Sequence, residues 1–424
     1  MTVPTIPLST FCAWRARRAG LGQAAATPPP EPRGIEAVLA TAGWLLAPGS
    51  TAPYLSLRLR SAACSREAVS QAVLRDRSLV RVTSVRGEPH FVPHRQVMVA
   101  IAAKGRRIDA RIRQINKVVS ISRGEVETLG MAILELLGEG PATIKKIEEG
   151  LPGGMLRSFG TEGRRAGVPG VLPVALEHLE EEGRVLHLDS GKRLDDGKRV
   201  YLLTEMALPE CTGCAPDQLQ VLPDVLHTYL ESFGPARVED FVWWAGTTLN
   251  RASAAAEALQ PPPVVIRVEG LDGDRLALPE DLESLARFEG SAPPEVALLP
   301  NRDPFYLGRK ALNREFLDFE APERVLARFR GKPVAARVLP TVVVNGRIVG
   351  VWEWRSRTRE IQWALFDSAS TAAWPAATLA AAIRREADWL TAFIREELDG
   401  KIVMDPRERG MHWAYGIDEI RSFW

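Results

Sequence analysis

The sequence predicts an α+β protein in which helices are followed by a β-hairpin three times over, before a last third that is rich in strands. Apolar residues recur at helical spacing ahead of each pair of short, β-branched runs. The last third instead holds four strand-like runs, with Asn345-Gly346, a strong hairpin signal, between two of them. At 424 residues the chain is long enough for about two to four domains.

Two helices and a strand are expected before the first hairpin. Thr10 to Ala19 predicts a short helix, and Ile35 to Ala42 predicts a second one after a Pro-rich linker from Pro28 to Pro32. Pro48-Gly49 breaks the following stretch into a loop, and Tyr54 to Leu59 then predicts a strand.

The first helix-and-hairpin unit follows this strand. Ser65 is a favourable N-cap for a helix that should run to about Arg75. Leu79 to Val85 is rich in β-branched residues, Arg86 to Pro89 turns the chain, and His90 to Val92 returns. This order is that of a winged helix, in which the helix can enter a major groove and the hairpin can touch the DNA backbone.

The most basic stretch of the chain follows the first hairpin. Arg95 to Lys117 contains seven Lys and Arg residues against one acid, Asp109. A surface that faces phosphates is one interpretation of this stretch. A plain exposed helix with long charged side chains is the other.

Two further units repeat the order of the first. Ser122 to Glu125 has the form of a capping box at the start of the second unit, whose hairpin is expected at Val185 to Leu188 and Arg199 to Leu203. The third unit should end in a hairpin of Val264 to Val268 and Arg275 to Leu278. Because the copies share an order of elements and no sequence motif, the repeat is one of supersecondary structure.

The last third predicts a small antiparallel β-barrel or sheet, closed by an amphipathic helix at Leu379 to Ile394. Trp352 and Trp354 share one face of their strand, where core packing is favoured over base stacking. The strand-like runs are Val334 to Leu339, Thr341 to Val344, Arg347 to Trp354 and Thr358 to Phe366. The chain should thus consist of a first winged helix with its basic extension (1–120), a second (121–208), a third (215–290), and a barrel or sheet with the closing helix (291–424).

Composition excludes several classes of protein. Lys plus Arg total 54 against 53 for Asp plus Glu, so a nucleic-acid surface must come from clustering and not from net charge. No apolar run reaches membrane-spanning length, and Pro4 and Pro7 lie where a signal peptide needs an apolar region, which predicts a cytoplasmic protein. Cys211 and Cys214 form only half of a zinc site, and His227 lies at no recognised ligand spacing, so we expect no metal.

Five segments occur in an order that is more specific than any one of them. With these segments the chain resembles, over nearly its whole length, a bacterial family of tandem winged-helix DNA glycosylases that act on alkylated purines and interstrand crosslinks. The segments are Trp14 to Leu21 (WRARRAGL), Arg77 to Pro93 (RSLVRVTSVRGEPHFVP), Phe233 to Gly246 (FGPARVEDFVWWAG), Leu298 to Leu307 (LLPNRDPFYL) and Val343 to Trp354 (VVNGRIVGVWEW).

The resemblance implies three winged helices and a β-barrel around a C-shaped, positive channel for double-stranded DNA. It also implies hydrolysis of an N-glycosidic bond, which leaves an abasic site. An N7-alkylated purine already carries positive charge, so the protein needs only to place water and to stabilise an oxocarbenium-like sugar. No cofactor is implied, because this hydrolysis needs only water.

Two motifs of this family serve the reaction. The first is a His, apolar, Pro element on the first wing, which His90-Phe91-Val92-Pro93 matches with one additional apolar residue. The second is a Gln, apolar, Gln or Asp element in the loop before the Tyr54 strand. Leu46-Ala47-Pro48 stands there instead, and none of these side chains can hold water or face a cation.

Catalysis would therefore depend on His90, with a substitute for the missing polar pair. Ser50, Thr51 or Glu88 could be that substitute if the loop is shifted. The alternative is that His90 is a hydrogen-bonded structural residue of the wing.

A DNA-binding protein of this kind would gather its arginines on one surface. Other functions stay open: a catalytically silent DNA binder, a winged-helix transcription regulator, or a protein-interaction scaffold that no longer touches DNA. A regulator would need a symmetric dimer, but no dimerisation helix is apparent, so we expect a monomer that associates with the nucleoid when bound to DNA. The candidate DNA-binding residues are Arg15, Arg18, Arg66, Arg86, Arg106, Arg107 and Arg113.

Overall fold

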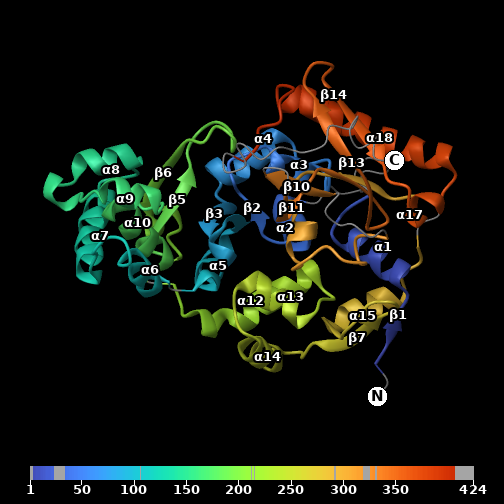
Figure 1. The fold of residues 1–424 in the computed structure, drawn as a ribbon, viewed down its shortest axis with the longest axis horizontal. Coiled ribbons are helices and arrows are strands. Elements are labelled where there is room, and N and C mark those ends of the chain that lie inside the picture. Colours follow the sequence, from blue (N-terminus) through green and yellow to red (C-terminus); the bar gives the residue numbers. More distant parts are fainter. Residues whose placement is uncertain are drawn as a thin grey trace. The chain divides into compact units, whose positions relative to one another are not determined.

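The structure, a computed structural model, has an α+β fold with several small sheets (Figure 1). It describes residues 3–22, 34–105, 107–211, 213, 215–290, 293–318, 325–329 and 332–405. The chain divides into two compact units, which we call the central unit, Val73–Val225, and the terminal unit, Met1–Ala72 with Leu226–Trp424. The division falls inside the part predicted at 1–120, so the helix after Ser65 and the hairpin that follows it belong to different units.

The central unit contains both of the hairpins predicted for its sequence. Strands β3 (Leu79–Thr83) and β4 (Pro89–Pro93) form the first, and β5 (Val185–Asp189) and β6 (Arg199–Leu203) form the second. Each pair is antiparallel. The helices of this unit are α5 (Val97–Lys104), α6 (Ile108–Ile115), α7 (Arg123–Gly138), α8 (Ile144–Gly150), α9 (Gly160–Arg165), α10 (Val171–Glu181) and α11 (Thr204–Ala207).

Helix α7 begins where its sequence predicts. The Ser122 side chain accepts a hydrogen bond from the backbone N–H of Glu125 at 3.1 Å, as an N-cap should. The Glu125 carboxylate does not complete the capping box, because it pairs with Arg157 at 2.7 Å. The apolar face of α7 then packs on α10 in a core that includes Ile133 and Leu172.

The terminal unit holds the remaining helices and three small sheets. Its sheets have the strand orders β1-β7-β8, β10-β11 and β14-β13-β12-β9, where β10 is Leu326–Phe329 and β11 is Lys332–Val338. The helices are α1 (Leu8–Arg18), α2 (Ile35–Ala42), α3 (Ala52–Arg58), α4 (Arg66–Ser70), α13 (Val238–Ala245), α14 (Leu249–Ala258), α15 (Pro279–Ala286), α16 (Pro304–Leu307), α17 (Ala369–Ala372) and α18 (Ala376–Glu397), while α12 (Gln218–Phe233) crosses from the central unit.

The strand predicted at Tyr54 to Leu59 is wrong, because this segment is helix α3. Leu55, Leu57 and Leu59 alternate as in a half-buried strand, which misled the prediction. Pro53 lies in the first turn of the helix, where its missing N–H costs nothing. Five consecutive residues of α3 from Pro53 on are buried, so the helix is enclosed on several sides and shows no amphipathic period.

The four-stranded sheet takes the place of the predicted barrel or sheet. Strands β9 (Val296–Leu299), β12 (Thr341–Val344), β13 (Arg347–Arg355) and β14 (Glu360–Leu365) are antiparallel neighbours. Asn345 and Gly346 turn the chain between β12 and β13 with φ of 46° and 80°, as their hairpin signal predicts. Within the described ranges β9 and β14 remain unpaired edges, so this is an open sheet and not a closed barrel.

The predicted core role of Trp352 is confirmed. Its side chain is 3% exposed, and its indole N–H donates to the Leu299 carbonyl at 2.9 Å. Helix α18 lies against β9 and β14 and covers the sheet. The indole N–H of Trp354 donates to the Gly400 carbonyl at 3.1 Å, beyond the end of that helix.

The hairpin predicted for the third repeat forms from β7 (Val264–Val268) and β8 (Arg275–Ala277). A third strand, which the sequence did not predict, joins it. β1 (Thr5–Ile6) pairs with β7 in the parallel direction. The first described residues of the chain therefore complete a sheet whose other strands lie some 260 residues later.

Helix α18 carries a buried acid whose ionisation should lower stability. Glu386 is 3% exposed, and burial raises the pKa of its carboxyl from 4.5 to about 7, although Arg385 offsets part of this. Because the pKa is raised in the folded state, the associated stability is present below about pH 4.5 and is lost as the pH rises through about 7.

We therefore expect Glu386→Gln to increase the free energy of unfolding by about 2 to 3 kcal/mol at pH 8, at about 1.4 kcal/mol per pKa unit. Near pH 4.5 the variant and the wild type should unfold alike. Urea denaturation at the two pH values measures this difference. The exposed residue Glu396, on the same helix, provides the control Glu396→Gln, which should change stability little at either pH. An equal effect of Glu386→Gln at both pH values would contradict the assignment.

Candidate functional site

His90 lies on β4, opposite Val82 of β3, and is 6% exposed. Its ring nitrogen Nδ1 is 2.9 Å from the Glu88 carbonyl oxygen. A carbonyl can only accept, so Nδ1 is the donor of this hydrogen bond. This contact fixes the orientation of the imidazole relative to the hairpin.

Two residues of the turn beside this contact adopt the left-handed backbone conformation, which is unfavourable for the arginine and ordinary for the glycine. Arg86 has φ 60° and Gly87 has φ 70°. The backbone N–H of Ser84 donates to the Glu88 carbonyl at 3.0 Å and closes the turn. One carbonyl thus accepts both from the backbone and from the His90 ring, so the turn and the imidazole are held together.

The hydroxyls of Ser50 and Thr51 take structural positions in the terminal unit. Thr51 is wholly buried, and its hydroxyl both donates to the Val403 carbonyl at 3.3 Å and accepts from the Val403 N–H at 3.2 Å. Ser50 is 3% exposed and accepts from the Ala52 N–H at 3.3 Å. These bonds favour a role in anchoring the loop over a role in holding a reacting water.

The three residues at the place of the missing polar pair are apolar and buried. Leu46, Ala47 and Pro48 are all buried. The structure therefore offers no replacement for the Gln, apolar, Gln or Asp element at this point of the chain.

Two of the predicted DNA-binding arginines are corrected, because their guanidiniums pair with acids of the protein itself. Arg15 is 4% exposed, pairs with Glu315 at 2.8 Å, and lies 4.3 Å from the centre of the Phe316 ring. The Arg18 guanidinium pairs with Asp281 at 2.9 Å and also donates to two backbone carbonyls. Both side chains are engaged inside the protein, so neither presents its charge to a phosphate.

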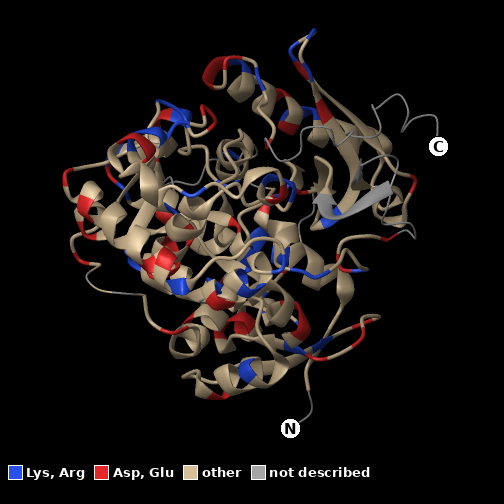
Figure 2. Cartoon of the chain, turned by 60° about the vertical axis from the view of Figure 1, so that its left-hand side comes forward, with Lys and Arg blue, Asp and Glu red and all other residues tan. Residues whose placement is uncertain are grey.

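The other predicted arginines divide between the units. Arg86, Arg107 and Arg113 are exposed and belong to the central unit, where Arg86 lies in the turn of the first hairpin. Arg66 belongs to the terminal unit and is half-buried at the start of α4. Arg106 lies outside the described residues. Figure 2 shows Lys and Arg segments interspersed with Asp and Glu segments along the ribbon, which agrees with the near-zero net charge.

A polar network joins the two hairpins of the central unit to each other and to α10, and the sequence did not predict it. Arg81 of β3 donates to the His187 carbonyl of β5 at 3.1 Å, and Thr83 donates to the Glu180 carboxylate at 2.9 Å. The His187 ring stacks on Tyr201 with centroids 4.1 Å apart. Burial, then the charge of Arg81, lowers the pKa of His187 to about 3, so this ring is neutral. The alternation of Arg81 and Thr83 with valines in β3 was the available signal.

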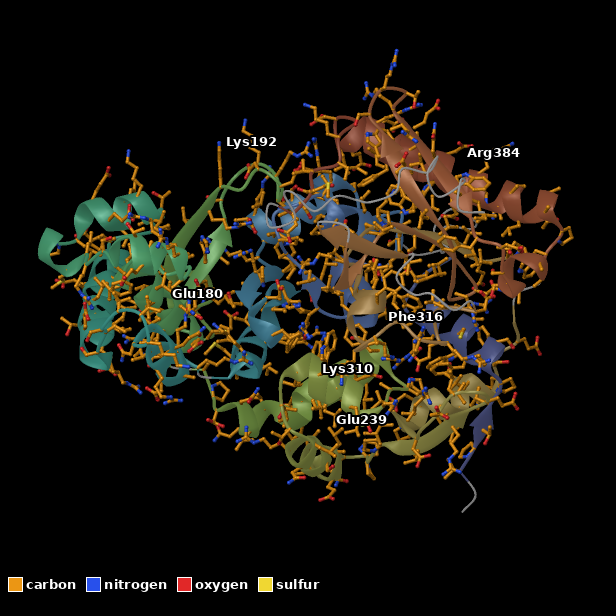
Figure 3. The ribbon with its side chains drawn as sticks, viewed as in Figure 1. Glu180, Lys192, Glu239, Lys310, Phe316 and Arg384 are labelled. Carbon is orange, nitrogen blue, oxygen red and sulfur yellow. The ribbon has the colours of Figure 1, made fainter. Side chains whose placement is uncertain are left out.

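The carboxylates of α10 complete this network. Glu181 accepts from the Lys104 ammonium at 3.0 Å and from the backbone N–H of Arg107 at 3.0 Å. Glu177 lies 3.5 Å from both Lys104 and Arg111. Burial raises the pKa of Glu180, which Figure 3 labels. The carboxylates of Glu177, Glu180 and Glu181 are therefore all engaged by neighbouring segments of the central unit.

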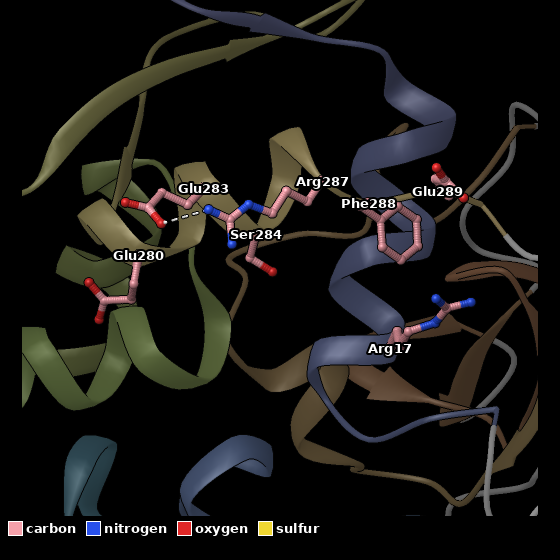
Figure 4. Close-up of a pocket in the computed structure, with 7 residues that line it drawn as sticks. All are labelled: Arg17, Glu280, Glu283, Ser284, Arg287, Phe288 and Glu289. Carbon is pink, nitrogen blue, oxygen red and sulfur yellow. Dashed lines mark ion pairs between the residues drawn. The ribbon is translucent and has the colours of Figure 1, made fainter.

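Two hollows in the terminal unit have the wrong charge for DNA. They measure about 570 and 530 Å³ and share walls that include Arg17, Ser284 and Phe288. Each is lined by more carboxylates than guanidiniums. Figure 4 shows the first, where Glu283 pairs with Arg287 along α15. Such walls repel a phosphate backbone.

The segment Leu298 to Leu307, which carries part of the family resemblance, has a structural role. Asp303 is wholly buried and caps α16 through the Phe305 N–H at 3.0 Å. Its carboxylate takes the Arg60 guanidinium in a two-point contact at 2.7 and 2.9 Å. Ser56 donates to the same carboxylate at 2.7 Å. Asp303 therefore joins α16 to α3 and to the residues that follow α3.

A second buried cluster joins the start of the chain to its last third. Glu315 is wholly buried and pairs with Arg15 at 2.8 Å, Arg275 at 2.8 Å and Arg309 at 3.0 Å. Burial alone would raise the pKa of Glu315, but the guanidiniums, Arg309 foremost, outweigh burial and hold it at about 2. The three arginines come from α1, β8 and the loop after α16.

Two further expectations concern membranes and metals. Among the described residues, no helix is long and apolar enough to span a bilayer, and no group of His, Cys, Asp and Glu side chains is arranged to hold a metal ion. Cys211 has a free thiol. Its neighbour Cys214 lies outside the described residues.

Comparisons with known proteins agree on one family. A family model described as DNA glycosylase AlkZ-like matches residues 39–393. The interstrand DNA cross-link repair glycosylase of Streptomyces sahachiroi is 32% identical over 153 residues, which are 33% of this chain and 36% of that protein. The solved structure of the Streptomyces sahachiroi DNA glycosylase AlkZ matches with a TM-score of 0.70 and 22% identity, over 91% of this chain and 97% of that one, and shows the same fold. The chain belongs to the AlkZ-like DNA glycosylase family.

Proposed function

We propose that this protein binds double-stranded DNA and hydrolyses the N-glycosidic bond of alkylated purines or crosslinked bases. The observation that carries the proposal is the geometry of His90. Its ring is oriented by the Glu88 carbonyl, on a hairpin whose turn presents the exposed Arg86. Membership of the family supports the same reaction, and the cross-link repair glycosylase named above is similar to one third of the chain.

The proposed reaction requires little of the protein. The C1′–N9 bond of the damaged nucleotide breaks, and its electron pair neutralises the cationic purine as that base leaves. Water then adds to C1′ of the oxocarbenium-like sugar, while the imidazole of His90 acts as the general base and accepts a proton from this water. Protonated His90 returns the proton to solvent, so the products are the free base and an abasic site. General-base help of this kind contributes a factor of about 10² to 10⁴ in rate.

The DNA partner would be held mainly through its phosphates. Arg86, Arg107 and Arg113 are the exposed members of the predicted set on the central unit. Arginine contacts to phosphate fix the register of a duplex without reading its sequence. Recognition would therefore depend on the positive charge of the alkylated base and on the weakness of its glycosidic bond.

We expect alkaline cleavage of a duplex with one N7-methylguanine after incubation with the wild-type protein, and none of its undamaged twin. His90→Ala should slow this cleavage by a factor of about 10² or more, since the general base is lost. His94→Ala is the matched control, because His94 follows the same strand and has no part in the proposed reaction. Equal cleavage rates for the wild type, His90→Ala and His94→Ala would contradict the proposed role of His90.

A catalytically silent DNA binder is the second candidate. The burial of Leu46, Ala47 and Pro48 at the place of the polar pair favours it. Such a protein would bind the damaged duplex in a salt-dependent way and would leave its bases intact. Binding at two salt concentrations, measured beside the cleavage reaction, separates this function from the first.

A further inference from the structure

The loop of the second hairpin, Ser190 to Lys198, presents two lysines on a scaffold formed by its own acids. We propose that this loop is a second contact with the DNA backbone, in addition to the hairpin that carries His90. The proposal rests on the proposed function in one respect, that duplex DNA is the ligand. It adds two lysines that were not among the predicted DNA-binding residues.

Asp196 shapes the loop from within. Its carboxylate accepts from the backbone N–H groups of Lys192 at 2.9 Å, Lys198 at 3.0 Å and Arg193 at 3.4 Å. Gly191 leaves the space for this carboxylate, because a Cβ at Gly191 would lie 1.8 Å from the Asp196 oxygen Oδ2. The loop therefore has a specified conformation that depends on a glycine and an aspartate at these positions.

The other acids of the hairpin end are also engaged. Asp195 binds the Arg193 guanidinium through both of its oxygens at 2.8 Å. Asp189, at the end of β5, pairs with Arg199 at 3.1 Å. Leu194 is 1% exposed and anchors the middle of the loop. Each of the three carboxylates thus has a partner within the hairpin itself.

Lys192 and Lys198 are left with their ammonium groups outward. Both residues are exposed, and Figure 3 shows Lys192 extending away from the end of the hairpin. Neither side chain has a hydrogen-bond or ion-pair partner in the part of the chain that the structure describes. The loop thus carries two exposed ammonium groups beside one exposed carboxylate, that of Asp196, and this net positive charge suits a phosphate backbone.

The helix ahead of this hairpin strengthens the inference. In a helix-then-hairpin unit either element can reach DNA, but the acids of α10 are engaged by Lys104, Arg111 and Thr83. Helix α10 also has no Lys or Arg of its own to bind a phosphate. The hairpin loop is therefore the element of this part of the unit that carries the charge for DNA.

The test compares charge variants of the full-length protein by their binding to the undamaged and the N7-methylguanine duplex over a range of salt. Lys192→Gln with Lys198→Gln should reduce the slope of log affinity against log salt by about 2, at about 0.9 per phosphate contact. Affinity should fall equally for both duplexes, since the loop reads no base. Lys192→Arg with Lys198→Arg should restore the wild-type slope.

Lys145→Gln with Lys146→Gln is the matched control. It removes the same charge from α8 of the same unit, where Glu148 and Glu149 balance the two lysines. The control should leave the slope unchanged. If the loop variant binds with the wild-type slope, the proposed contact is wrong while the proposed function stands; if the wild-type protein binds neither duplex, the proposed function itself fails and this contact with it.

Discussion

Replacing Glu315 with alanine should destabilise the protein by about 3 to 5 kcal/mol, since breaking a buried ion pair leaves uncompensated charge behind. Three guanidiniums lie within 3.0 Å of this one carboxylate. Without it, Arg15, Arg275 and Arg309 would repel one another in a site closed to water. Urea denaturation at pH 7 measures the loss.

The pH dependence of stability tests whether the ionised carboxylate of Glu315 provides this stabilisation. The pKa of this carboxyl is about 2 when folded against an ordinary value of 4.5, so its stabilisation is present above about pH 4.5 and is lost as the pH falls towards 2. Glu315→Ala should remove this part of the acid sensitivity. Glu283→Ala, which breaks an exposed pair with Arg287, is the control and should cost less than about 1 kcal/mol. A similar loss in both variants would contradict the account.

Asp303→Ala should be nearly as damaging, with an expected loss of about 3 to 5 kcal/mol. The variant leaves the Arg60 guanidinium buried without its two-point partner and removes the cap of α16. Thermal unfolding of the variant and the wild type measures the change. The comparison variant is Asp274→Ala, whose pair with Arg267 is more than half exposed on each side.

Asp274→Ala should cost at most about 1 kcal/mol, because water screens an exposed pair. If Asp303→Ala were equally mild, the view that the Leu298 to Leu307 segment serves the fold would be wrong. That segment contributes to the family resemblance. We expect Asp303 to serve the stability of the fold and not to contact DNA.

The elements that could be predicted from sequence are those with local signals. Ser122 caps a helix, and Asn345-Gly346 turns a hairpin, because each acts on a few neighbouring backbone groups. The prediction for the segment after Pro53 was wrong for the opposite reason. Leu55 and Leu57 alternate as in a strand, but burial on several sides of α3 removes the helical period that would have corrected the prediction.

The candidate site was predictable only in part. His90 was a candidate through the family resemblance of His90-Phe91-Val92-Pro93, and the structure adds the bond that orients its ring. Arg15 and Arg18 could not be excluded as DNA contacts, because their partners Glu315 and Asp281 lie more than 260 residues away. Basic residues in a sequence show charge, but only the fold shows whether an acid neutralises it.

The most direct test of the central claim is to detect the released base itself. Mass spectrometry after incubation with the N7-methylguanine duplex under single-turnover conditions should show free 7-methylguanine with the wild-type protein and with His94→Ala. His90→Ala should release it at least about a hundredfold more slowly, as expected for loss of a general base. No free base above the rate without protein, from a duplex that the wild-type protein demonstrably binds, would contradict the glycosylase account and leave a silent DNA binder.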